Sequence, residues 1–192
     1  TNIDLATAGY MGSALTTSNS PYYLTVKAID KAGNVTSGST QFYFRFDNTP
    51  PTNPAYITAP SGFINTKEAT FSWPTVGGSA PSDANSGIAG LQYKIGSTSW
   101  YGDDHTGAGD INDLLTNDGS YTTLNTPDYD NIEEGINTVE FRTWDQAGNI
   151  SSSNVPAALK INTSGAPSEP TNLTASPSTS SSNSFSFSWT QP

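Results

Sequence analysis

The feature that most constrains the fold of this chain is an internal repeat with a spacing of about 115 residues. The segment YLTVKAIDKAGNV at residues 23–35 returns as TVEFRTWDQAGNI at residues 138–150. A second pair, ATFSW at residues 69–73 and FSFSW at residues 185–189, has nearly the same offset. Because this spacing is too long for a solenoid repeat and suits a whole domain, the chain contains parts of several copies of one unit.

The repeated segments have the periodicity of β-strands. Between residues 22 and 28 every second side chain is apolar or aromatic, and the same alternation recurs between residues 42 and 46. A period of two with one apolar face indicates antiparallel strands, whereas a helix would need apolar residues three and four positions apart. The side chains that we predict to be buried in the core are Phe42, Phe44, Phe46, Trp73 and Trp189.

Turn and linker signals divide the chain. The sequences DKAGN at residues 30–34 and DQAGN at residues 145–149 predict hairpin turns, in which glycine supplies a positive φ and aspartate caps its own backbone. Proline-rich stretches at residues 48–54 and 165–170 predict stiff, extended connectors, because proline cannot join a central strand and its φ is fixed.

These signals predict three units. Residues 1–49 are the closing strands of a first repeat, residues 50–165 form a complete repeat with an acidic insertion at 102–130, and residues 166–192 open a third repeat. Since residue 1 falls within a repeat pattern, we expect the chain to be an excerpt from a longer protein. Each outer piece then lacks about half of its domain and needs flanking chain or a neighbouring copy to complete it.

Charge and composition exclude several kinds of partner. The chain has 7 basic and 17 acidic residues, a net charge of −10, which disfavours binding to nucleic acid or to an anionic membrane surface. It has no cysteine, so disulfides and thiol chemistry are excluded. No apolar run approaches the roughly 20 residues that span a bilayer, so we expect no membrane insertion in this segment.

Two stretches carry a family resemblance. The sequence PSEPTNLTA at residues 167–175, followed by FSWTQP at residues 187–192, resembles the start of a fibronectin type III domain. The sequences SGIAGLQYKI at residues 86–95 and WDQAGN at residues 144–149 are similar to bacterial Ig-like modules of large surface and secreted proteins.

The resemblance implies an all-β chain of tandem antiparallel β-sandwich domains, the outer two incomplete, in an extracellular or cell-surface protein. Its partners would then be neighbouring repeats of the same chain. One departure is Asn137, which stands where the first copy has Tyr22, so a tyrosine corner is missing from the second copy.

Catalytic groups are sparse. The only histidine, His105, lies in a polar glycine-rich loop, which favours a solvated side chain over a catalytic one. Glu133, Glu134 and Glu140 offer carboxylates for glycoside hydrolysis, but the first two form a charged loop and the third alternates with buried positions in a strand. We therefore predict that this chain is not an enzyme.

The acidic insertion is the candidate metal site. Nine acidic residues and no lysine or arginine lie between residues 103 and 134, and calcium prefers such oxygen ligands on flexible loops. An EF-hand is excluded, because Leu114 and Leu115 occupy its ligand and glycine positions. A solvated acidic loop is the favoured interpretation, and one bound calcium ion is the alternative. The ligands that we expect for calcium are Asp103, Asp104, Asp110 and Asp113.

Trp100 and Tyr101 are the candidate ligand-binding residues, since exposed aromatic rings on a β-sheet stack against sugars. Adjacent strand residues point to opposite faces, so only one of the two is expected to be exposed. The favoured function is a structural spacer or adhesin stalk. The alternatives are a glycan- or protein-binding module that uses the insertion, and an accessory region of a large secreted hydrolase.

Overall fold

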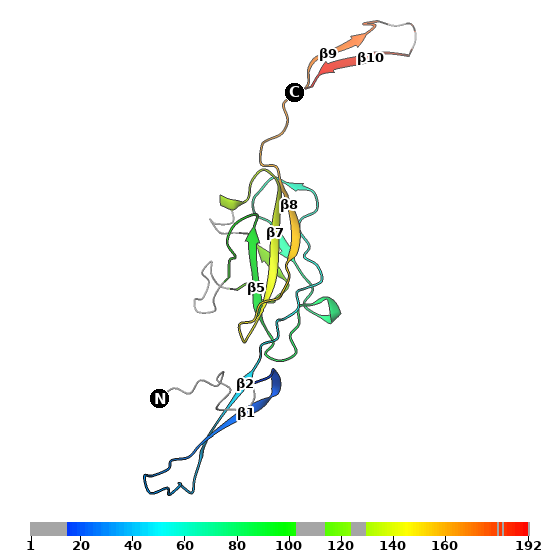
Figure 1. Cartoon of the computed structure of the whole chain (residues 1–192). Helices are drawn as coiled ribbons and strands as arrows, with labels where there is room; N and C mark the ends of the chain where they lie inside the picture. Colours follow the sequence, from blue (N-terminus) through cyan, green and yellow to red (C-terminus); the bar gives the residue numbers. More distant parts are fainter. Residues whose placement is uncertain (1–14, 103–113, 124–129, 180, 182, 192) are drawn as a thin grey trace.

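The computed structural model describes residues 15–102, 114–123, 130–179, 181 and 183–191. It is mostly β and consists of several small sheets, so the prediction of strands in place of helices is confirmed. A hairpin lies at each end of the molecule, and a larger central module lies between them (Figure 1).

The central module contains two sheets. The larger has the strand order β3–β8–β7–β5, in which β3 runs parallel to β8 and the other neighbours are antiparallel. The smaller pairs β4 with β6 in antiparallel fashion. The bounds are β3 (Phe63–Ile64), β4 (Thr70–Ser72), η1 (Gly77–Ser79), β5 (Ile88–Ile95), β6 (Ser120–Thr122), β7 (Gly135–Asp145) and β8 (Val155–Ile161).

Aromatic rings from both sheets build the core of the central module. Along β7 the side chains of alternate residues are buried, which places Phe141 inside and Arg142 on the outer face. The ring of Phe141 lies 5.4 Å from the ring of Phe71 on β4 and 6.1 Å from that of Trp73. Burial of these large apolar groups supplies most of the stability of such a module.

The terminal hairpins reproduce parts of the central module. The first pairs β1 (Ser18–Val26) with β2 (Thr40–Phe46), and the second pairs β9 (Thr171–Ser176) with β10 (Ser186–Thr190). Leu24 faces Phe42 across the first hairpin, as Val139 faces Ala157 across β7 and β8. Pairing of these residues is therefore the same at a shift of 115 residues, so the repeat seen in the sequence is also a repeat of strand register.

The prediction of buried apolar stripes is correct for Trp73 but wrong for the hairpins. Trp73 is 5% exposed, whereas Phe42 is 63% and Trp189 is 54% exposed, and Phe44 and Phe46 are only half-buried. The physical reason is that each hairpin is a single layer. Alternation selects which face of a strand is apolar, but burial requires a second layer, and no other described segment covers either hairpin.

The leucines that exclude an EF-hand belong to the edge of the larger sheet. Leu115 and Leu91 exchange backbone hydrogen bonds of 2.9 Å, and Leu114 is buried. This close approach depends on Gly90, because a Cβ atom there would lie 2.5 Å from the carbonyl oxygen of Leu115.

Asn137 takes over the contact that Tyr22 makes in the first copy. The hydroxyl of Tyr22 donates to the carbonyl of Thr16 over 2.7 Å, which ties β1 to the segment before it. In the second copy the Asn137 side chain donates to the carbonyl of Glu133 over 2.7 Å and accepts from its N–H over 2.9 Å. The tyrosine is absent, but its link to the preceding loop is preserved.

Candidate functional site

The two DxAGN turns have the same hydrogen bonds, as the sequence predicts. Asp145 Oδ1 accepts the N–H groups of Ala147 and Asn149 at 2.9 and 2.8 Å, and its Oδ2 accepts Asn149 Nδ2 at 2.7 Å. Asp30 makes the equivalent three bonds, at 2.9, 2.8 and 2.8 Å. The glycines of the two turns have φ values of 89° and 90°, a conformation that other residues rarely adopt. The two turns differ in burial, since Asp145 is fully buried and Asp30 is exposed.

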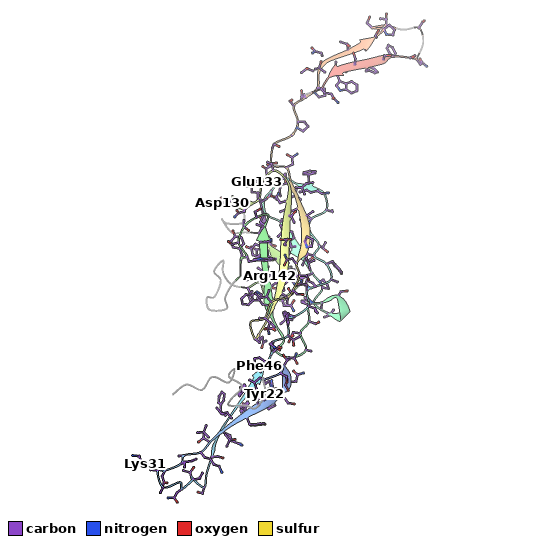
Figure 2. All side chains as sticks on the ribbon, viewed as in Figure 1. Tyr22, Lys31, Phe46, Asp130, Glu133 and Arg142 are labelled. Carbon is purple, nitrogen blue, oxygen red and sulfur yellow. The ribbon has the colours of Figure 1, made fainter. Side chains whose placement is uncertain are left out.

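The junction between the first hairpin and the central module lies beside the Asp145 turn. Asp47, which follows β2, accepts the N–H of Ser86 with Oδ2 at 3.1 Å and the side chain of Asn149 with its carbonyl at 3.2 Å. Asn19 Nδ2 on β1 donates to the carbonyl of Ala84 over 3.0 Å. Figure 2 places Phe46 at the end of the hairpin next to the central module and Lys31 at the far tip.

The proline-rich connector that follows is packed into the central module. Asn53 Oδ1 accepts the N–H of Thr143 at 2.9 Å and the hydroxyls of Thr143 and Ser151 at 3.0 and 2.8 Å. Pro51 and Pro54 are buried on either side of it. The predicted stiffness of this connector therefore has a second source, the side-chain bonds of Asn53, besides the fixed φ of proline.

Three carboxylates converge at the junction. One oxygen of each of Asp47, Asp83 and Asp145 lies within 4.8 Å of the other two. Asp83 Oδ1 accepts the N–H groups of Ser86 and Gly87 at 2.8 and 2.9 Å. In the described part of the chain, the donors that contact these carboxylates are N–H groups, a side-chain amide and hydroxyls, which carry no positive charge. Chemically, the three carboxylates are a set of oxygen ligands that a divalent cation such as calcium could use.

The junction keeps Asp47 ionised at neutral pH. Partial burial by itself would raise the pKa of this carboxyl, since desolvation disfavours the charged form. Hydrogen bonds from Ser86, Thr49 and Thr17 outweigh that effect and hold the pKa below its ordinary value of 3.8.

The acidic cluster differs from the metal site that the sequence suggested. The predicted ligands Asp103, Asp104, Asp110 and Asp113, together with His105, lie outside the described residues. The cluster instead combines a turn aspartate with Asp47 and Asp83 from two distant segments. A signal for Asp47 exists in the sequence, since it stands directly between an apolar strand and a proline-rich connector.

Trp100 and Tyr101 lie in different environments. The ring of Tyr101 stacks on Tyr93 at 5.2 Å and packs against the core, while its hydroxyl accepts Asn131 Nδ2 at 3.1 Å. Trp100 lies on the outer face of the sheet, where the Arg142 guanidinium sits 4.1 Å and the Lys94 ammonium 5.2 Å from its ring centroid. Burial lowers the pKa of Arg142 from its ordinary value, but a guanidinium remains charged at neutral pH.

We expect that Trp100→Ala lowers the free energy of unfolding by about 1 kcal/mol, because it removes the aromatic face beneath Arg142 and Lys94. Chemical denaturation of the two proteins measures this. Trp100→Phe is the matched control and is expected to retain about half of the effect, since it keeps a smaller ring. Equal stability of all three proteins would contradict a structural role for the indole. A polysaccharide panel applied to the same proteins tests the alternative of glycan binding.

Two of the three glutamates considered for glycoside hydrolysis have partners that lie outside the carboxylate cluster. Glu140 forms an ion pair of 2.5 Å with Lys94, and Glu134 accepts the N–H and hydroxyl of Thr163. Glu133 borders an open hollow of about 610 Å³ that Asp130 also lines, at the end of the central module nearer the second hairpin (Figure 2). Of the three glutamates that the sequence offers for glycoside hydrolysis, Glu134 and Glu140 are therefore engaged by other residues of the chain.

Neither a protein-family model nor a curated protein sequence matches the chain. Within the part of the chain that the structure describes, no helix has the length and apolar character needed to cross a membrane.

Proposed function

We propose that this chain is a run of tandem β-sandwich modules of Ig-like and fibronectin type III-like kind. It acts as a structural spacer or stalk in an extracellular or cell-surface protein, and we assign no catalysis to it. The observation that carries this proposal is the repetition of one strand pair and one turn with the same register and the same hydrogen bonds.

A spacer must hold each unit in a fixed orientation relative to the next, and the hydrogen bonds of the first junction can do this. Asn19 and Asp47 attach the hairpin to the loop at residues 84–86 of the central module, and Asn53 attaches the connector to β7. Several short attachments of this kind restrict bending more than a flexible linker of equal length would.

The second junction differs from the first. Asn162 stands at the position equivalent to Asp47, and residues 164–170 are exposed throughout. The connector to the second hairpin therefore has less contact with the central module than the connector to the first.

The test is ¹⁵N relaxation of the full chain at neutral pH. We expect amides of β1 and β2 to report the same rotational correlation time as those of β7, because the first junction makes them one rigid body. Amides of β9 and β10 serve as an internal control and are expected to move faster. Independent tumbling of the first hairpin would contradict the spacer proposal. Repeating the measurement with calcium shows whether the carboxylate cluster uses a cation.

Acidification should release the first junction. Because the folded-state pKa of Asp47 lies below its ordinary value of 3.8, its contribution is fully present above pH 3.8 and is lost as the pH falls through the folded-state value. We therefore expect the two correlation times to separate only below pH 3.8. The variant Asp47→Ala should show that separation already at neutral pH, whereas Glu169→Ala, which lies beyond the other end of the module, should not.

A further inference from the structure

Arg142 lies on the outer face of the larger sheet, in the middle of the central module (Figure 2). Its neighbour Lys94 is paired with Glu140, whereas no carboxylate of the described residues pairs with Arg142. Arg142 instead contacts neutral groups. Its Nε donates to Gln92 Oε1 over 2.6 Å, and its guanidinium lies 4.1 Å from the ring centroid of Trp100. The sheet therefore holds a partly buried cation without a counter-ion, which an anion would stabilise.

Gln92 determines which edge of the guanidinium remains available. The Gln92 side chain is 2% exposed and lies opposite Arg142 across the pairing of β5 with β7. Because Gln92 occupies Nε, the terminal nitrogens Nη1 and Nη2 keep their N–H groups, and none of the described residues accepts from them. Two N–H groups side by side match the two oxygens of a carboxylate. Arg142 is thus held in an orientation that suits one carboxylate group.

A second hydrogen-bond donor without an acceptor lies on the same face. Trp144 follows Arg142 by two positions on β7, so the two side chains leave the strand on the same side of the sheet. Within the described structure Trp144 Nε1 is buried and has no hydrogen-bond partner. A buried donor without an acceptor is costly in free energy. A ligand with several oxygen atoms would supply acceptors for this N–H group as well as for Arg142.

The shape of this face favours a sugar over a peptide. Strand β7 lies between β8 and β5, so its backbone groups pair on both sides and offer no open edge to which a peptide strand could add. On β8 the side chains of Pro156 and Ala158 face outward and are small, which keeps the surface beside β7 flat. A sugar ring fits a flat surface, and the aromatic ring of Trp100 offers it an apolar contact.

The charge of the module limits how many anionic groups the ligand carries. Thirteen acidic and four basic residues lie between positions 50 and 165, so a polyanion such as nucleic acid would be repelled. A single carboxylate responds mainly to the charges within about 8–10 Å of it, because salt screens the more distant ones. The local charge at Arg142 is therefore sufficient for a ligand with one carboxylate.

We infer that Arg142, Gln92 and Trp100 form a binding site for a sugar that carries one carboxylate, such as a uronic acid. Arg142 binds the carboxylate, Gln92 positions the guanidinium, and Trp100 contacts the sugar ring. The inference adds a ligand to the proposed spacer and does not depend on the rigidity of the first junction.

The test titrates the full chain with the methyl glycoside of galacturonic acid and, separately, with the methyl ester of the same sugar. Binding is followed in ¹H–¹⁵N spectra, in which the indole N–H signal of Trp144 reports on the site. We expect saturable binding of the acid, with a shift of this signal, and binding of the ester that is weaker by about tenfold, because the ester lacks the charge. This comparison uses the wild-type protein, so it does not depend on the folding of any variant.

Variants then locate the site. Arg142→Gln should weaken binding of the acid by about tenfold, and Arg142→Lys should lose most of the affinity as well, because lysine lacks the paired N–H groups. Lys160→Gln is the matched control, since it removes one positive charge from the same sheet opposite Ile136, six positions along β7 from Arg142. It should bind like the wild type.

Three results would overturn the inference. They are spectra of the wild type that do not change with the acid, equal affinity for the acid and the ester, and equal loss of affinity in Arg142→Gln and Lys160→Gln. Equally tight binding of N-acetylglutamate amide would show that the site recognises the carboxylate without the sugar, and would overturn the assignment of the ligand class.

Discussion

Replacing Phe71 by alanine is expected to lower the free energy of unfolding of the central module by about 3–5 kcal/mol. The Phe71 side chain is fully buried and its ring lies 5.4 Å from that of Phe141, so the substitution removes apolar contacts between the two sheets and leaves a cavity. Urea denaturation followed by tryptophan fluorescence and by far-ultraviolet circular dichroism measures the change.

The sequence repeat supplies a matched control for this substitution. Phe187 occupies the equivalent position in the second hairpin, in the same FSW context, but is 62% exposed. Phe187→Ala should therefore leave the unfolding of the central module unchanged. A similar loss of stability in both variants would mean that Phe187 is buried within its own chain.

The contrast between Phe71 and Phe187 marks the limit of what the sequence could predict. Period-two alternation identified the strands, and the repeat identified equivalent positions, because both depend only on local order along the chain. Burial of a strand side chain depends instead on whether a second layer of the structure covers that face of the strand. Trp73 and Trp189 have the same local sequence, yet 5% of one and 54% of the other is exposed, since only the first has a second sheet over it.

The carboxylate cluster shows a similar limit. Turn chemistry predicted the capping role of Asp145 from five residues, since the bonds run within the turn. Its approach to Asp47 and Asp83 depends on how three distant segments meet, which composition and spacing do not encode. Local charge density therefore predicts calcium ligands in the stretch richest in acidic residues, whereas it does not predict where carboxylates from distant segments converge.

The turn at Asp145 joins the core of the central module to the first junction, because the Asn149 side chain bonds both Asp145 and the carbonyl of Asp47. Asp145→Ala is expected to lower the free energy of unfolding by about 3 kcal/mol, because it removes a fully buried carboxylate that accepts hydrogen bonds from the N–H groups of Ala147 and Asn149. It also frees the Asn149 side chain, which holds the carbonyl of Asp47. Unfolding in urea measures the first effect, and the relaxation of the first hairpin measures the second.

Asp30→Ala is the control, since Asp30 makes the same three bonds in the exposed copy of the turn. We expect it to leave both the stability of the central module and the correlation time of the junction unchanged, because the Asp30 turn contacts neither. Equal destabilisation by the two substitutions would show that the turn acts through its hydrogen bonds alone. If only Asp145→Ala lowers the free energy of unfolding, the same turn sequence stabilises the protein in one copy and not in the other. The difference would then come from the burial of Asp145 and from the neighbouring junction that its turn supports.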